Sequence, residues 1–262
     1  MKLSVCYIVK NEILKLPESI KHVRELADEI CIVDTGSTDG TVQYAKFAAD
    51  KFAKFKWCDN FSAARNKSLE LATGDWILVL DADEWIDSNY FPKIRTLTLR
   101  TDVEGFLFTI FNFMQDPMWV KKPAVLYGKA IRLFRKGYKY EGIVHNKLNI
   151  ENPADSGLSV NNFAFKERDT IREKCDRNKK LMEKKIKSQG WTHINCIHYS
   201  DIYRKLWTWH GDIKDGMKAV HYLNEALKKQ KDIKITQVRD LILKEIEYVK
   251  QNRLQNKLNK SA

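Results

Sequence analysis

The chain has 262 residues, of which 44% are hydrophobic and 31% charged, a composition typical of a globular protein with one substantial core. No apolar run approaches the length of a membrane span, the amino terminus lacks a signal-peptide pattern, and the five cysteines are scattered without a C-x-x-C pair. These features argue against a membrane-spanning protein, a disulfide-rich domain and a zinc module, and we expect a cytoplasmic protein.

The net charge of +12 lies almost entirely in the last part of the chain. Residues 1–165 hold 22 basic and 21 acidic side chains, a net +1, whereas residues 166–262 hold 24 and 13, a net +11. A basic segment can contact an anionic membrane surface, a nucleic acid or an acidic partner, and a lysine-rich solvent face of ordinary helices explains it equally well. Aromatic residues are not interleaved with the lysines, which argues against nucleic acid.

Strand and helix signals alternate along the first 86 residues. Short apolar runs predict buried strands, and the stretches between them contain helix-starting residues, with Pro17, Thr41 and Ser62 expected to open or cap three helices. This alternation indicates a parallel sheet with right-handed crossovers. The expected strands lie at 4–9, 30–33, 52–57 and 76–80.

The pattern changes after residue 86. A helix is expected around 90–99, and residues 105–113, 130–134 and 138–145 have the pattern of strands. Residues 115–128, which contain two prolines and a glycine, are expected to form a mobile loop. These strands predict a mixed or antiparallel second half of the sheet.

The segment 166–262 is almost free of glycine and proline and rich in Lys, Glu and Leu, so we expect helices. A helical hairpin with its turn near Gly211–Gly216 resembles one tetratricopeptide unit. The expected organisation is therefore an α/β domain over residues 1–165 and a basic helical region over residues 166–262.

An acidic cluster follows the last strand of the first half. The run Trp76–Leu80 predicts a strand buried on both faces, and Asp81, Asp83 and Glu84 come directly after it. Ligands bind at the carboxyl edge of open α/β sheets. A solvated acidic turn explains an isolated D-x-D motif, but at this edge the carboxylates suit a divalent cation.

The loops after the first, second and fourth strands are expected to open on the same edge of the sheet. Polar residues far apart in the sequence then converge there, although they span about seventy residues. These residues are Asn11, Glu12, Asp34, Arg65, Asp81 and Asp83.

Six motifs follow one another along residues 1–165. They are VKNE at 9–12, VDTGSTDGT at 33–41, FSAARN at 61–66, GDWILVLDADE at 74–84, RLFR at 132–135 and YEGIVHNKL at 140–148. With these motifs in this order the chain resembles the family 2 glycosyltransferases, which have the GT-A fold, a Rossmann-like mixed sheet with a parallel amino-terminal half. It looks most like the subgroup with C-terminal helical repeats that includes bacteriocin S-glycosyltransferases, and also like lipopolysaccharide-core glucosyltransferases.

The resemblance implies a nucleotide-sugar donor, usually a UDP-sugar, and transfer with inversion at the anomeric carbon. By motif position, Asp81 would lie near the ribose and the metal, and Asp83 would bind Mn²⁺ or Mg²⁺ across the diphosphate. A metal on the diphosphate stabilises the departing UDP. The residues implied to contact the nucleotide are Asn11, Glu12, Asp34, Thr35 and Arg65.

Two departures from the family pattern leave roles open. Asn146 stands where many relatives have a glutamate after the histidine, and Asn162 stands where relatives have a histidine that completes the metal site. Glu141 and His145 are the candidates for activating the acceptor, against the alternatives of a surface ion pair and a structural histidine. For Glu84 the sequence leaves two roles open: it supports the residues of the site, or it contacts the metal or the acceptor itself.

The sequence therefore predicts a metal-dependent inverting glycosyltransferase acting on a peptide or glycan. The alternative is a catalytically weak sugar-nucleotide-binding protein that interacts with partners through its helical tail, which the two asparagines motivate. The tail is also expected to pair two subunits, as in repeat-bearing relatives, or to contact an anionic membrane surface.

Overall fold

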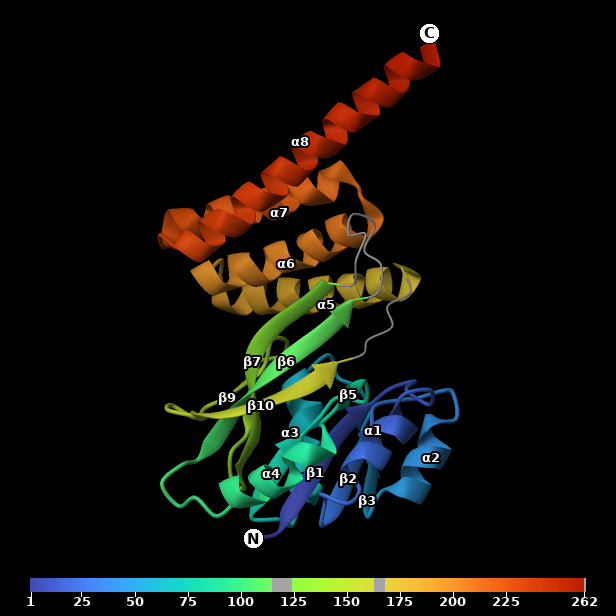
Figure 1. The fold of residues 1–262 in the computed structure, drawn as a ribbon, viewed down its shortest axis with the longest axis vertical. Coiled ribbons are helices and arrows are strands. Elements are labelled where there is room, and N and C mark those ends of the chain that lie inside the picture. Colours follow the sequence, from blue (N-terminus) through green and yellow to red (C-terminus); the bar gives the residue numbers. More distant parts are fainter. Residues whose placement is uncertain (115–123, 163–167, 262) are drawn as a thin grey trace. The chain divides into compact units, whose positions relative to one another are not determined.

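The structure is a computed structural model, and it describes residues 1–114, 124–162 and 168–261 (Figure 1). The described residues fall into two compact units, one built from residues 1–114 and 124–162 and the other from residues 168–261. The predicted helical segment thus corresponds to the second unit. The division at residue 165 stays a prediction about how the protein is organised.

The first unit contains a mixed eight-stranded sheet in the described part of the chain, with strand order β3-β2-β1-β4-β7-β6-β10-β5. The strands β3, β2, β1 and β4 are parallel, which confirms the predicted parallel half. Strand β7 runs antiparallel to β4 and β6, β10 runs parallel to β6, and β5 antiparallel to β10. The bounds are β1 Leu3–Val9, β2 Glu29–Asp34, β3 Lys51–Lys54, β4 Trp76–Val79, β5 Glu84–Trp85, β6 Gly105–Met114, β7 Ala124–Arg135 and β10 Ala154–Asn162.

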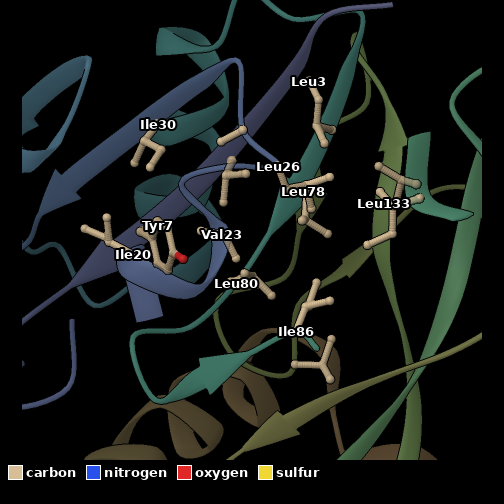
Figure 2. Close-up of a cluster of buried hydrophobic side chains, with 14 of the residues drawn as sticks. Leu3, Tyr7, Ile20, Val23, Leu26, Ile30, Leu78, Leu80, Ile86 and Leu133 are labelled. Atoms are coloured by element: carbon tan, nitrogen blue, oxygen red, sulfur yellow. The ribbon is translucent and has the colours of Figure 1, made fainter. Parts of the chain in front are cut away.

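Alternate residues of β1 face two different cores, because both faces of the sheet are covered. Leu3 and Tyr7 pack in a core with α1 and α4, and Figure 2 shows them with Leu78 of β4. Cys6 points to the other core, formed with α3 and a short two-stranded hairpin, β8–β9. The bounds are α1 Leu16–Val23, α2 Thr41–Ala48, α3 Phe61–Leu71, η1 Ser88–Tyr90, α4 Phe91–Leu97, β8 Tyr140–Glu141 and β9 Lys147–Leu148.

Two predicted helix caps are wrong. The cap of α2 is Gly40, and Thr41 is the first residue of the helix, where its Oγ1 accepts a hydrogen bond from the Glu12 amide at 2.8 Å. The cap of α3 is Asn60, whose side chain accepts from the Ala63 amide. In both cases the predicted residue bonds another segment of the chain instead of its own helix.

Several strand boundaries also differ from the prediction. Strand β3 is shorter than residues 52–57, β7 begins well before residue 130, and within residues 138–145 only β8 is a strand. Strands β5 and β10 were not predicted. Residues 115–123 of the expected loop lie outside the described residues, and the remainder of that segment belongs to β7.

The second unit consists of α5 Arg168–Gln189, α6 His193–His210, α7 Ile213–Lys229 and α8 Ile233–Ser261. The predicted hairpin is confirmed: α6 ends at Gly211, which adopts a left-handed conformation, and Asp212 caps α7 by accepting from the Lys214 amide. Across residues 1–114, 124–162 and 168–261, no helix combines the length and the apolar content needed to cross a membrane.

Candidate active site

The loops after β1 and β2 are tied together at the carboxyl edge of the sheet, because these strands are neighbours. Asn11 has a φ of 55°, a left-handed conformation that asparagine tolerates better than most residues. Its amide donates to Ser37 Oγ at 2.9 Å, and its Oδ1 accepts from the Thr38 amide at 2.8 Å. Together with the bond between the Glu12 amide and Thr41, this joins the two loops into one wall.

Asp34 ends β2 and is almost completely buried. Its Oδ1 accepts from the amides of Gly36 and Ser37 at 2.9 and 3.0 Å, in a turn where Gly36 has a φ of 110° that favours glycine. Thr35 Oγ1 donates to the Val9 carbonyl at 3.0 Å. Among the described residues, Asp34 Oδ2 has no hydrogen-bond partner. A buried carboxylate oxygen without a donor is costly, so this atom suits a ligand N–H.

Two guanidinium groups hold the acidic loop after β4. Arg65, on α3, donates through Nη2 to Asp81 Oδ1 at 2.8 Å. Arg132, on β7, lies 3.6 Å from Asp81 Oδ2 and 2.5 Å from Glu84 Oε1. The Asp81 amide donates to Glu84 Oε2 at 3.0 Å. The positive and negative groups therefore alternate, and the position of Asp81 is fixed from two sides.

Glu84 is enclosed, with 2% of its surface exposed. Burial raises the pKa of its carboxyl, and the positive charge of Arg132 opposes this rise and favours the ionised form. Its carbonyl accepts from Ser19 Oγ at 2.6 Å, which connects the acidic loop to α1. Of the roles left open by the sequence, the geometry favours support: Glu84 holds Arg132 and the Asp81 amide.

Asp83 lies beside Asn162, whose Nδ2 is 3.4 Å from Asp83 Oδ1. The pairing of β10 with β5 places them together, because Asn162 is opposite Glu84 in that ladder. No group of three or more His, Cys, Asp or Glu side chains in the described ranges could hold a metal ion. A Mg²⁺ ion bound to a diphosphate needs only one or two protein ligands. Asp83 with Asn162 fits that requirement, and Asp81 is engaged by arginines.

Glu141 and His145 lie exposed on the β8–β9 hairpin, where His145 has a φ of 49°. The hairpin is held by α3: Asn66 Nδ2 donates to the Tyr140 carbonyl at 3.0 Å, and the Tyr140 amide donates to Asn66 Oδ1 at 2.7 Å. Ser62 Oγ donates to the Gly142 carbonyl. The structure thus places both candidates on one element that the FSAARN motif anchors.

Arg132 and Asn66 were not among the predicted site residues. Both lie inside motifs recognised in the sequence, RLFR and FSAARN. The only available signal for Arg132 was its position as the basic residue of the otherwise apolar strand predicted at 130–134. A basic residue in such a strand indicates a buried partner of opposite charge. Asn66 carries no comparable signal, because its partners are backbone groups of a distant hairpin.

The sequence model of glycosyl transferase family 2 matches residues 4–168, which is more than half of the chain. The chain belongs to glycosyl transferase family 2. As a member of this family the chain has the GT-A fold, and the mixed sheet followed by helices agrees with the expectation from the sequence.

Curated relatives match this chain over part of their length. A TPR repeat-containing protein of Synechococcus elongatus is 37% identical over 51% of this chain and 32% of its own length. The SPbeta prophage-derived glycosyltransferase SunS of Bacillus subtilis is 28% identical over 69% of this chain and 44% of its own length. The chain therefore spans less than half the length of these relatives.

Among solved structures, the chain is similar to that of S. aureus TarS 1-349. The match covers 87% of this chain and 81% of the TarS chain, with 12% sequence identity and a TM-score of 0.48.

Proposed function

We propose that this glycosyltransferase transfers a hexose from a UDP-sugar, with inversion and with Mn²⁺ or Mg²⁺ as cofactor, to a peptide or glycan acceptor. The observation that carries the choice of nucleotide is the buried Oδ2 of Asp34 at the end of β2, to which none of the described residues donates a hydrogen bond. This atom accepts hydrogen bonds and cannot donate them. The N3–H of uracil supplies such a donor, whereas N3 of cytosine is an acceptor and would repel the carboxylate.

The acidic loop supports the diphosphate end of the proposal. Asp83 and Asn162 would hold the metal ion, which when bound neutralises the charge that develops on the departing diphosphate. Arg65 and Arg132 keep Asp81 in place and balance its charge, so that the loop is preorganised before the donor binds. The wall of Asn11, Glu12 and Thr35 would enclose the nucleoside on the side of β1 and β2.

Acceptor activation is assigned to the β8–β9 hairpin, with Glu141 or His145 as the general base. A general base contributes roughly 10²–10⁴-fold to such a reaction. The two candidates are separable by comparing the pH–rate profiles of Glu141→Gln and His145→Asn. Asparagine tolerates the left-handed backbone at residue 145, so the second variant keeps the turn. The pH–rate profile should lose the limb that reports the general base only in the variant in which that base has been replaced.

The direct test of the activity is UDP release from UDP-glucose and UDP-N-acetylglucosamine in the presence of Mg²⁺. We expect the wild-type chain to release UDP slowly to water and faster when an acceptor is supplied. If UDP binds but none is released from any donor with any acceptor extract, the protein is a sugar-nucleotide-binding module instead. Pairing of two subunits through the helical region, contact with an anionic membrane and a cytoplasmic location stay predictions from the sequence.

A further inference from the structure

A cavity of about 310 Å³ lies next to the arginine-held acidic loop, between α3, β6, β7 and the β8–β9 hairpin. Its volume is at the lower end of the range for small-molecule sites. All of its lining residues belong to the first unit. The polar and aromatic lining residues are Arg65, Lys129, Arg132, Tyr140, Asn146 and Lys147.

Three lining residues carry buried donors that no described residue accepts from. They are Nε and Nη1 of Arg65, Nε of Arg132 and Nδ2 of Asn146. Arg132 is itself 9% exposed. Guanidinium groups stay charged and only donate, so their remaining hydrogen bonds need an acceptor that the described residues do not supply, such as a ligand oxygen. The convergence of such donors on one cavity indicates a ligand group that is rich in acceptors.

The charge of the lining points to an anion. Four of the lining side chains are cationic. Asp81 and Glu84 balance Arg65 and Arg132, and Asp155 pairs with Lys129 at the surface. Lys147 is exposed at the hairpin and adds a further positive charge. Arginine in particular suits phosphate and carboxylate, because its planar fork matches two oxygens of either group.

Apart from Arg65, for which the family resemblance implies a nucleotide contact, the lining of the cavity lies away from the nucleoside side of the site. In the sheet, β7 and β6 lie on one side of β4, and β1 and β2 lie on the other. Asn11 and Asp34 belong to the loops of β1 and β2, whereas the cavity is lined by β6, β7 and the hairpin that carries the candidate bases. The acidic loop after β4 lies between them.

We propose that this cavity binds a phosphate or carboxylate group of the acceptor, so that the acceptors of this enzyme are anionic. The inference rests on the proposed transferase function and specifies the class of its acceptor. Binding the anionic group beside Arg65 and Arg132 would place the rest of the acceptor next to the β8–β9 hairpin. Asn146 then has a role: its side chain is uncharged and offers a donor, Nδ2, in the wall of an anion site.

Equilibrium dialysis of the full chain with radiolabelled inorganic phosphate tests the proposal, first alone and then with saturating UDP and Mg²⁺. A parallel series with radiolabelled acetate tests the carboxylate. The informative variants are Asn146→Asp, which replaces a donor by a negative acceptor of the same shape, and Lys147→Glu. Lys136→Glu is the matched control, because this exposed lysine follows β7 at the opposite edge of the sheet.

We expect phosphate or acetate to bind together with UDP, and its affinity to fall by at least about tenfold in Asn146→Asp and Lys147→Glu but not in Lys136→Glu. UDP affinity should be the same in all four proteins. Unchanged anion affinity in the two cavity variants, or no binding of either anion, would overturn the proposal. Competition between UDP and phosphate would also overturn it, since the cavity would then serve the diphosphate of the donor.

The two proposals fail separately. UDP binding in Mg²⁺ is measured without any acceptor anion, so its loss would contradict the donor site alone. Anion binding in the absence of UDP is measured without the donor, so its loss would contradict the acceptor cavity alone.

Discussion

Strand β2 begins and ends with a buried carboxylate, and the two carboxylates differ in how many hydrogen-bond partners the described residues supply. Glu29, at the amino-terminal edge, accepts from the Thr73 amide and hydroxyl and from Cys31 Sγ, and it pairs with Lys2 at 2.8 Å and Lys51 at 3.3 Å. Asp34, at the carboxyl-terminal edge, is equally buried, but one of its oxygens has no partner among the described residues.

The same contrast holds for other charged groups of the two edges. At the amino-terminal edge Asp28 accepts two hydrogen bonds from Arg95, and Asp50 accepts from Arg24 and from the Ile30 amide. At the carboxyl-terminal edge Arg65, Arg132 and Asn146 keep donors for which the described part of the chain supplies no acceptor. The amino-terminal edge therefore contributes stability through completed interactions, whereas the carboxyl-terminal edge retains, at a cost in stability, the hydrogen-bonding capacity that the proposed ligands would use.

The largest expected effect comes from breaking the buried ion pair at the carboxyl-terminal edge. Arg132→Met leaves Glu84 buried without its guanidinium, and loss of one partner of a buried pair costs about 3–5 kcal/mol. Chemical denaturation measures the loss. Arg100→Met, which removes an exposed pair with Asp102, should cost less than about 1 kcal/mol.

A second substitution in the same background checks the cause. In Arg132→Met/Glu84→Gln the buried negative charge is absent, so most of the lost stability should return. A double variant as unstable as Arg132→Met would show that packing, and not the ion pair, sets the cost.

The next largest effect is expected at the amino-terminal edge of the sheet, at Glu29. Burial raises the pKa of Glu29, but hydrogen bonds from Lys2, Thr73, Cys31 and Lys51 together lower it to about 2. Relative to the ordinary glutamate pKa of 4.5, this shift corresponds to about 3 kcal/mol of stability. Because the folded pKa is depressed, the contribution is present above pH 4.5 and is lost as the pH falls toward 2.

Glu29→Gln should therefore destabilise the protein by about 2–3 kcal/mol at neutral pH, and the difference from wild type should shrink below pH 4.5. Urea unfolding at several pH values measures it, with the exposed Glu70→Gln as control. UDP affinity should be unchanged in the folded fraction. If Glu29→Gln were as stable as wild type but bound UDP poorly, the result would contradict the assignment of stability to the amino-terminal edge and of ligand binding to the carboxyl-terminal edge.

A smaller effect is expected at Asp83. Asp83→Ala removes the proposed metal contact and the 3.4 Å contact with Asn162 Nδ2, so the expected loss of stability is small, about 1 kcal/mol. UDP affinity in Mg²⁺ should fall on the order of ten- to a hundredfold, about 1.4–2.7 kcal/mol. Calorimetry with and without Mg²⁺ measures it, with Asp102→Ala as control. Metal-independent binding of undiminished strength would contradict the assignment.

The sequence predicted the parallel half of the sheet well, because the runs at 4–9, 30–33 and 76–80 are apolar enough to require burial on both faces. It missed β10 because that strand is polar, with the sequence ADSGLSVNN, and is recognisable only from its pairing with β6 and β5. It overextended the strand at 138–145, where Gly142 and His145 have positive φ values that end the strand pairing.

For the candidate site, the sequence predicted which residues follow the strands at one edge of the sheet, but it did not indicate their contacts. That Asp34 follows β2 is a local fact, whereas the partner of each of its oxygens depends on the turn at Gly36. The pairing of Asp81 with Arg65 and Arg132 joins three distant segments and leaves no local signal. The cavity beside them likewise depends on the docking of the β8–β9 hairpin on α3.

The affinities of UDP and CDP for the wild-type chain and for Asp34→Asn test most directly whether the carboxyl-terminal edge is reserved for a uracil nucleotide. The substituted amide can still accept from Gly36 and Ser37 through one oxygen, but it presents an N–H where Oδ2 was. We expect wild type to prefer UDP and the variant to lose or reverse that preference, with unchanged stability. An equal preference for UDP in both proteins would contradict the account.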